Sequence, residues 1–293
     1  MTGTPRPARL EIIAATPTPF TADGDLDRVA WRACLGRLAP VVDGLFVAGT
    51  TGEFPALTDG ERLHLFEDAL DAVGPARVVA HVGAAGTRQA VALTRAAVAA
   101  GVLRLAAITP YYLPASQQAV LTHFGRLAEA AAGAAMYGYL YPDRTQVGLD
   151  PSAIGSLAAA GIRGLKISGA ASELVEQYVE RAPEGFSVWS GADRDLVRVA
   201  RCGGAGLVSG VSSAAPWAFV ALRDALAAGA GEAEIAVRQR AVDAAVDAFD
   251  SIAAMKSGLA ELGLAGPLCR MSVDPPDPAA LETIRRTVRA MPG

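Results

Sequence analysis

Short apolar runs alternate along the chain with longer stretches that are rich in Ala, Leu, Glu and Arg. The apolar runs predict eight strands, at residues 12–15, 44–48, 77–82, 103–109, 135–140, 164–167, 187–190 and 206–211. The runs are apolar throughout rather than alternating with polar residues. This pattern is typical of parallel strands that are covered on both faces.

Helices are predicted between these strands, at residues 27–38, 59–73, 87–100, 116–131, 151–159, 171–181 and 193–202. Local signals agree with these bounds. Thr58 or Asp59 can cap the start of a helix. Pro151 follows the capping residue Asp150 and suits a first helical position. Three predicted helices end next to a glycine: Gly101, Gly133 and Gly161. Eight strand–helix units in a row predict an α/β fold, a (β/α)8 TIM barrel.

The chain continues well beyond the eighth strand. Further helices are predicted at residues 216–228, 232–262 and 278–290. The first closes the eighth unit, so we expect a catalytic barrel at residues 1–228 and a C-terminal helical extension packed on it at 229–293. The competing fold is an open doubly wound sheet. It usually has a glycine-rich phosphate turn after its first strand, where this chain has Thr16-Pro17-Thr18-Pro19-Phe20.

Composition narrows the function. The 293 residues carry a net charge of −4 and no basic run, which argues against nucleic-acid binding. Residues 1–20 have no signal-peptide pattern, and no apolar stretch of about 18 residues predicts a membrane span. The three cysteines are far apart, which favours reduced thiols and a cytoplasmic location: Cys34, Cys202 and Cys269. The histidines form no metal-ligand cluster, so no metal is expected and each has a structural role: His64, His81 and His123.

Catalytic groups of such a barrel lie at the C-terminal ends of its strands. Lys166 stands out there because the chain has only two lysines, and this one lies inside an apolar strand. Burial lowers the pKa of an ammonium, and a neutral amine can attack a ketone to form an imine. The alternatives are a lysine that extends to the surface or pairs with a carboxylate.

Other strand ends offer further polar groups. The turn Gly49-Thr50-Thr51-Gly52 can hold a carboxylate with its backbone N–H groups, or be an ordinary turn. Tyr139 can carry a proton, but Tyr137 and Tyr141 share its strand face, and the pattern alone does not choose among the three. Arg144 can bind a second carboxylate or lie on the surface.

Together these motifs resemble the dihydrodipicolinate synthase / N-acetylneuraminate lyase family of class I, Schiff-base aldolases. The resemblance spans nearly the whole chain and rests on the Gly-Thr-Thr-Gly-Glu turn at 49–53, Thr-Pro-Tyr-Tyr at 109–112, Tyr-x-x-Pro-x-Arg-Thr at 139–145 and Gly-Leu-Lys-x-Ser at 164–168. It implies a lyase that forms a lysine imine with pyruvate and needs no cofactor, usually as a homotetramer or homodimer.

The resemblance also implies roles for single residues. Lys166 matches the imine-forming lysine, Tyr139 the proton-carrying tyrosine, and Thr50 the threonine that links it to a second tyrosine. Tyr112 matches that second tyrosine, which usually comes from a neighbouring subunit. The substrate-binding positions are Thr51 and Arg144, for the carboxylates of pyruvate and the second substrate. Val208 matches a residue whose backbone carbonyl faces the bound keto acid, and Gly191 lies at the end of strand seven.

The second substrate is the less determined part. Arg144 and the three relay residues favour aspartate semialdehyde, the partner of pyruvate in 4-hydroxy-tetrahydrodipicolinate synthases. Leu113 and Leu140 depart from the synthase pattern and favour a lyase for 2-keto-3-deoxy sugar acids or N-acetylneuraminate. Positions that bind feedback lysine in regulated synthases are unsuitable here: Phe54, Ala85 and Gln89. A barrel that binds a keto acid without catalysis is the third reading.

Overall fold

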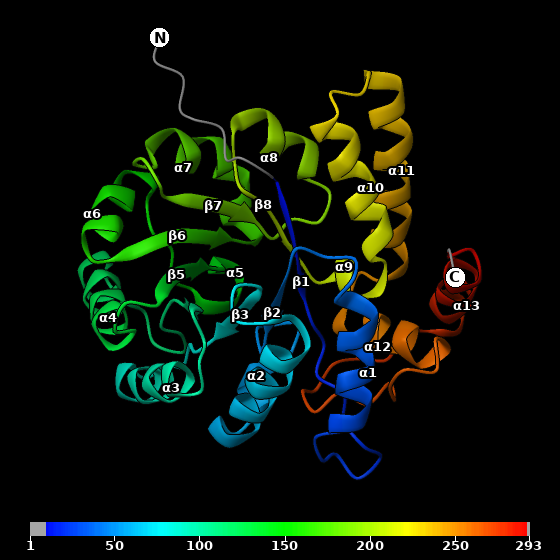
Figure 1. Ribbon diagram of the computed structural model, residues 1–293, viewed down its shortest axis with the longest axis horizontal. Coiled ribbons are helices and arrows are strands. Elements are labelled where there is room, and N and C mark those ends of the chain that lie inside the picture. Colours follow the sequence, from blue (N-terminus) through cyan, green and yellow to red (C-terminus); the bar gives the residue numbers. More distant parts are fainter. Residues whose placement is uncertain (1–9, 292–293) are drawn as a thin grey trace.

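The computed structural model describes residues 10–291, and its centre is a closed barrel of eight parallel strands surrounded by helices (Figure 1). The strands are β1 Glu11–Ala15, β2 Gly44–Val47, β3 Val78–His81, β4 Arg104–Ile108, β5 Ala135–Leu140, β6 Ile162–Ile167, β7 Ser187–Ser190 and β8 Gly206–Ser209. Each strand pairs with the next, and β8 closes the barrel by pairing with β1 from Glu11↔Gly206 to Ala14↔Ser209. The predicted TIM barrel is confirmed, and every predicted strand lies within two residues of its expected bounds.

Alternate residues of each strand enter two separate cores. On β1, Ile12 and Ala14 pack outward against the helices, while Ile13 and Ala15 pack inside the barrel. All four are at most 2% exposed. Because both faces are buried, the strand must be apolar at every position, which is the pattern seen in the sequence.

The surrounding helices are α1 Arg28–Leu38, α2 Asp59–Val73, α3 Thr87–Ala99, α4 Gln117–Ala130, α6 Ile154–Ala159, α7 Val175–Arg181, α8 Leu196–Cys202 and α10 Pro216–Ala227. Thr58 caps α2 in a capping box with Glu61, as expected from its type and position. Residues 151–153 and 169–174, before α6 and α7, are 3-10 turns. The short helices α5 Pro142–Thr145 and α9 Val211–Ala214 were not predicted, because four-residue helices carry no periodic pattern.

The expected helix at 232–262 is wrong as a single element. It is two helices, α11 Glu232–Ala248 and α12 Ile252–Glu261. Phe249 turns its fully buried ring toward Gly258, where an added Cβ would lie 2.5 Å from that ring. Ser251 then starts α12 with a new cap, since its side chain accepts a hydrogen bond from the Ala254 backbone N–H.

The C-terminal helices lie along one side of the barrel (Figure 1). There α11 packs against α10, α13 Pro278–Arg289 against α11 and α12, and α12 against α9. The boundary between the barrel and the C-terminal extension, at residues 228 and 229, stays a prediction. The contacts above are those expected of an extension that packs on the barrel.

Three further expectations concern the chain as a whole. Cys34, Cys202 and Cys269 are unpaired thiols. Among the helices of residues 10–291, none combines the length and the apolarity that crossing a bilayer requires. The first part of the segment searched for a signal peptide, residues 1–9, lies outside the described residues.

Candidate active site

Lys166 lies inside the barrel on β6 and is 7% exposed. Its Nζ is 4.1 Å from the ring centroid of Tyr139 and 4.8 Å from that of Phe46. Burial among these rings lowers the pKa of the amine to about 7, and the nearby negative charge of Asp193 partly opposes that effect. The side chain neither extends to the surface nor forms an ion pair within the described residues. An uncharged amine, the form that can attack a ketone, is therefore accessible at neutral pH.

Three tyrosines line the barrel interior at successive levels, Tyr137 and Tyr139 on β5 and Tyr141 directly after it. Tyr137 is the deepest, with its ring 5.2 Å from Trp189 and 5.7 Å from the Arg104 guanidinium. Tyr139 is paired with Lys166 in the β5–β6 register. Tyr141 lies nearest the mouth. Register thus selects Tyr139 as the tyrosine beside the amine, which the sequence pattern did not do.

Tyr139 and Thr50 form the first link of the expected proton relay. Their hydroxyl oxygens are 3.1 Å apart. Tyr139 is 1% exposed, and burial raises the pKa of its phenol to about 12, so it keeps its proton at neutral pH. It can therefore act as a proton donor beside Lys166.

The turn that carries Thr50 and Thr51 is held from several sides. The Glu53 N–H donates to the Thr50 carbonyl at 3.0 Å, and the Thr18 hydroxyl donates to the Gly52 carbonyl at 2.7 Å. Glu53 is fully buried, with φ of 56°, and its carboxylate accepts from Lys256 Nζ and from the Met271 N–H. The second lysine of the chain is thus a structural partner of the threonine turn.

Tyr112 does not join this relay within the chain. It is 91% exposed, has φ of 80°, and makes no hydrogen bond or ring contact within residues 10–291. Its neighbour Tyr111 points inward, with its ring 5.7 Å from that of Phe54. A relay that includes Tyr112 needs a second copy of the protein, in agreement with the role that the resemblance implies.

The substrate-binding positions surround the same opening. Arg144, on α5, places its guanidinium 5.6 Å from the ring centroid of Tyr141 and makes no ion pair within the described residues. Val208, on β8, lines a cavity of about 10 Å³ together with Lys166. At Gly191 a Cβ would lie 3.2 Å from Lys166 Cε and 2.1 Å from Ser168 Oγ, so a side chain there would press on the amine.

Asp193 follows the end of β7 by three residues, and nothing in the sequence pattern assigns it a role. Burial raises the pKa of its carboxyl to about 6, while a hydrogen bond from Ser209 and the charge of Lys166 oppose that change. Ser209 is the last residue of β8, 16 positions later in the chain. The Asp193 carboxylate therefore favours the protonated form of Lys166. In the sequence, its position just after a strand end was the only signal that could have indicated this role.

His81 has the structural role that was expected. Its Nδ1 lies 2.9 Å from the Ala48 carbonyl oxygen, and its Nε2 accepts from the Ile108 N–H at 3.2 Å. Complete burial and the charge of Arg62 lower its pKa well below the ordinary value, so the ring is neutral. Within residues 10–291, no three His, Cys, Asp or Glu residues come together as metal ligands would.

Comparison with known proteins agrees with this geometry. A sequence model of the Dihydrodipicolinate synthetase family matches residues 8–291. This chain belongs to that family. The 4-hydroxy-tetrahydrodipicolinate synthase of Neisseria gonorrhoeae is 32% identical over 288 residues, covering 95% of this chain and 97% of the relative. That of Salinibacter ruber is 35% identical over 215 residues, covering 72% and 71%.

Solved structures of the family share the fold. Dihydrodipicolinate synthase from Aquifex aeolicus is 26% identical and covers 96% of this chain and 97% of its own, with a TM-score of 0.85. The sialic acid aldolase of Ruminococcus gnavus is 20% identical and covers 95% of this chain and 96% of its own, with a TM-score of 0.86, a likeness of fold alone. The predicted family is confirmed, and with it the enzyme class, a pyruvate-dependent lyase of the Schiff-base type.

Proposed function

We propose that this dihydrodipicolinate synthetase family member joins pyruvate to an aldehyde through an imine on Lys166. The observation that carries this proposal is the buried amine with a pKa of about 7, held 4.1 Å from the Tyr139 ring. An exposed lysine with its ordinary pKa would be almost fully protonated at neutral pH and unable to attack.

The reaction begins when pyruvate places its carboxylate at the Thr50-Thr51 turn. The Lys166 nitrogen attacks the ketone carbon, Tyr139 donates a proton to the leaving hydroxyl, and water departs to leave an imine. Loss of a proton from the pyruvate methyl group gives an enamine, whose carbon forms the new bond to the aldehyde carbon. The protonated imine accepts the electrons, so the residues present supply the chemistry without a metal or an organic cofactor.

The second substrate we propose is aspartate semialdehyde. Arg144 supports it, because its guanidinium at the barrel mouth has no ion-pair partner among the described residues and can bind the carboxylate of that aldehyde. Relatives that are 30–37% identical carry the name 4-hydroxy-tetrahydrodipicolinate synthase. We propose a cytoplasmic enzyme that works as a homodimer or homotetramer, with Tyr112 supplied between copies.

A sugar-acid or N-acetylneuraminate-type lyase is the second candidate. Leu113 favours it, since its side chain is 70% exposed and gives the mouth an apolar rather than an amide group. Leu140 does not bear on the choice, because its side chain is fully buried in the core between the strands and the helices. Pyruvate offered with each aldehyde separates the two, with product mass as the measurement. Turnover of sugar aldehydes without turnover of aspartate semialdehyde would contradict the synthase proposal.

A catalytically silent barrel that only binds a keto acid is tested by trapping. Pyruvate and borohydride should add one reduced pyruvyl group, which peptide mapping places on Lys166. The Lys166→Arg variant should show no adduct, whereas Lys256→Arg, at the other lysine of the chain, should still be labelled. Native protein without an adduct would favour the silent barrel.

A further inference from the structure

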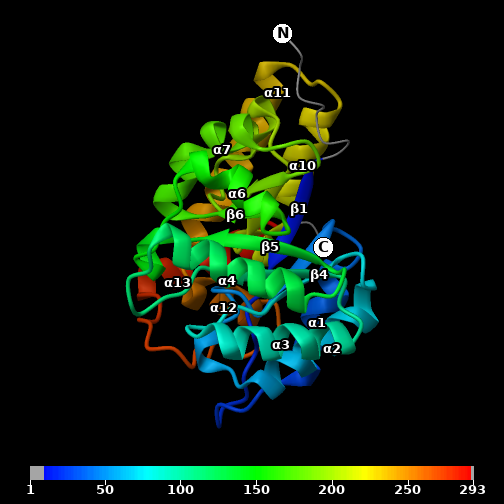
Figure 2. The same cartoon turned by 90° about the vertical axis from the view of Figure 1, so that its left-hand side faces the viewer.

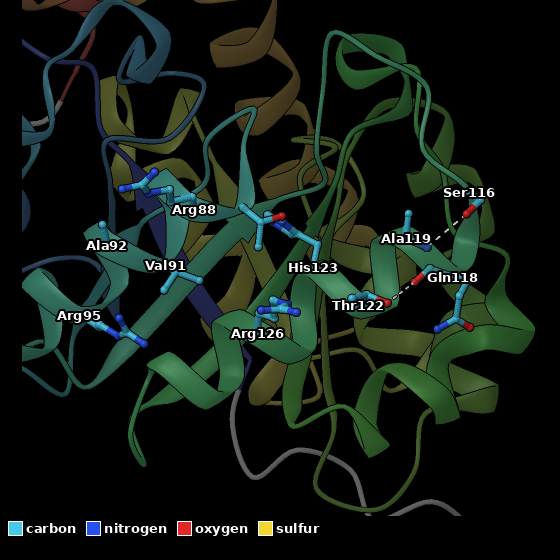
Figure 3. A pocket seen from close by; sticks show the side chains of 11 residues that line it. Arg88, Val91, Ala92, Arg95, Ser116, Gln118, Ala119, Thr122, His123 and Arg126 are labelled. Atoms are coloured by element: carbon cyan, nitrogen blue, oxygen red, sulfur yellow. Dashed lines mark hydrogen bonds between the residues drawn. The ribbon is translucent and has the colours of Figure 1, made fainter.

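A groove on the outside of the barrel lies between α3 and α4, away from Lys166. Its volume is about 820 Å³, within the range of roughly 300–1,000 Å³ that small-molecule sites occupy. Figure 2 shows α3 and α4 side by side, and Figure 3 shows the residues that line the groove. None of its eleven lining residues is acidic.

Three arginines line the groove without a partner. On α3, Arg88 and Arg95 are seven positions apart and share one helix face, and Arg126 faces the groove from α4. All three are exposed, and none makes an ion pair or hydrogen bond within residues 10–291. Several other surface arginines are paired, as Arg198 is with Glu176 and Arg201 with Glu232, whereas three unpaired ones lie together here. A local cluster of unpaired guanidinium groups on a protein of net charge −4 attracts anions.

His123 adds a buried polar group at the same place. It is 2% exposed and lines the groove between the two helices (Figure 3). Its Nδ1 lies 2.9 Å from the Thr87 hydroxyl oxygen, while its Nε2 has no hydrogen-bond partner. Burial lowers its pKa to about 4, so the ring is neutral at pH 7 and carries one proton. When Thr87 donates to Nδ1, that proton is on Nε2 and needs an acceptor.

We propose that this groove binds a small organic anion with at least two negative charges, held by the three exposed arginines next to the buried His123 Nε2–H. Guanidinium groups bind phosphate and carboxylate oxygens through paired N–H donors. The groove can therefore recognise either kind of anion by the same contacts. A ligand with several charges is required because a single exposed ion pair contributes little. Binding would also select the tautomer of His123 that donates from Nε2.

Calorimetric titration at constant ionic strength tests the proposal with two probes, pyrophosphate and citrate. Saturable binding of either probe is expected. Pyrophosphate alone would assign phosphate esters as the ligand class, and citrate alone would assign polycarboxylates. The double variant Arg95→Gln/Arg126→Gln should bind at least about tenfold more weakly, since two charge-assisted hydrogen-bonding groups are lost.

Matched controls separate this groove from general charge and from the barrel mouth. Arg163→Gln/Arg240→Gln removes two exposed arginines that likewise have no partner and lie outside the groove, and Arg144→Gln removes the cation near Tyr141. The Arg163→Gln/Arg240→Gln control should bind as native protein does, and Arg144→Gln should keep the binding that is lost in Arg95→Gln/Arg126→Gln. Absence of saturable heat with both probes, or an equal loss in the Arg163/Arg240 control, would overturn the proposal.

The histidine gives an independent readout. The chain has three histidines, so their imidazole nitrogens can be followed by ¹⁵N NMR. Saturating probe should shift the Nε2 signal of His123, and the shift should be absent in the Arg95→Gln/Arg126→Gln variant. An unchanged His123 spectrum at saturation would contradict the assigned binding mode.

Discussion

At Lys166 the protein removes water from an amine and surrounds it with aromatic rings. The same burial that lowers its pKa to about 7 would disfavour any lysine that stayed charged there. Asp193 opposes the change, because its negative charge favours the ammonium. The pair therefore sets the pH range in which the nucleophile is available.

This balance predicts a pH profile. Since the neutral amine attacks, kcat/KM for pyruvate should rise with pH through about 7 and then level off. Asp193→Asn removes the opposing charge, so the pKa of Lys166 should fall and the rise should move to lower pH by roughly one pH unit. Asp195→Asn is the matched control, since that carboxylate is paired with Arg198, and it should leave the profile in place. An unchanged profile in Asp193→Asn would show that the carboxylate does not act on the amine.

Burying Lys166 should also lower the free energy of unfolding of the native protein. The folded pKa of about 7 is below the ordinary value of 10.5, so the unfolded chain binds the proton more tightly. The free-energy cost of burying the Lys166 ammonium is therefore greatest below pH 7, and it disappears as the pH rises toward 10.5. At pH 6 the free energy of unfolding of Lys166→Met, measured by urea titration, should therefore be higher than that of native protein by about 1–4 kcal/mol. At pH 9 the difference should be smaller. An equal gain at both pH values would exclude this origin.

Sequence was enough to find Lys166, because a rare lysine in an apolar strand is visible without coordinates. It was not enough to choose Tyr139 over Tyr137 and Tyr141, because only the β5–β6 register decides which ring meets the amine. Asp193 received no role because its carboxylate comes near the Lys166 amine only in the folded barrel.

Among the elements, the threonine turn depends on the C-terminal chain. Lys256 on α12 is 1% exposed and pairs with the fully buried Glu53. Arg270 nearby binds Glu61 at 2.7 Å and lies 4.3 Å from the Phe20 ring centroid. These contacts join residues more than 200 positions apart around the turn that carries Thr50.

Breaking this pair should be costly. Lys256→Met leaves the Glu53 carboxylate buried without its cation, which should lower the free energy of unfolding by about 3–5 kcal/mol in urea titration. Glu53→Gln/Lys256→Met removes both charges and should recover part of that loss. A surface pair, Arg201 with Glu232, gives the control, and Arg201→Met should cost less than about 1 kcal/mol. Equal losses for the buried and the surface variant would contradict the structural role of Lys256.

Element prediction succeeded where burial or capping repeats along the chain, as in the strands and in α2 with its capping box. It failed at residues 249–251, where the break between α11 and α12 depends on Phe249 packing against Gly258. That contact is a property of the folded chain, so local propensity alone cannot indicate it.

At the scale of the whole molecule, the relay that we propose is incomplete within one chain. Thr50 and Tyr139 are in contact, whereas Tyr112 faces outward at 91% exposure. Tyr112→Phe should leave folding unchanged yet reduce kcat by roughly 100-fold, provided that a neighbouring copy supplies the hydroxyl. Tyr111→Phe is the matched control and should have a smaller effect.

Dilution tests the same assembly. Activity per chain should fall at concentrations where sedimentation shows single chains, and it should not fall further in Tyr112→Phe. Full activity of a monomer would show that Tyr112 has no role in the relay.

The burial of both lysines has a practical consequence for chemical labelling. The other strongly basic side chains are all arginines. Acylating or reductively alkylating reagents therefore meet no exposed ε-amine on the described surface. One of the two amines is neutralised by a carboxylate, and the other faces the opening of the barrel. A small electrophilic reagent applied to the intact enzyme should therefore report on the occupancy of the barrel interior, with no background from exposed ε-amines of the described residues.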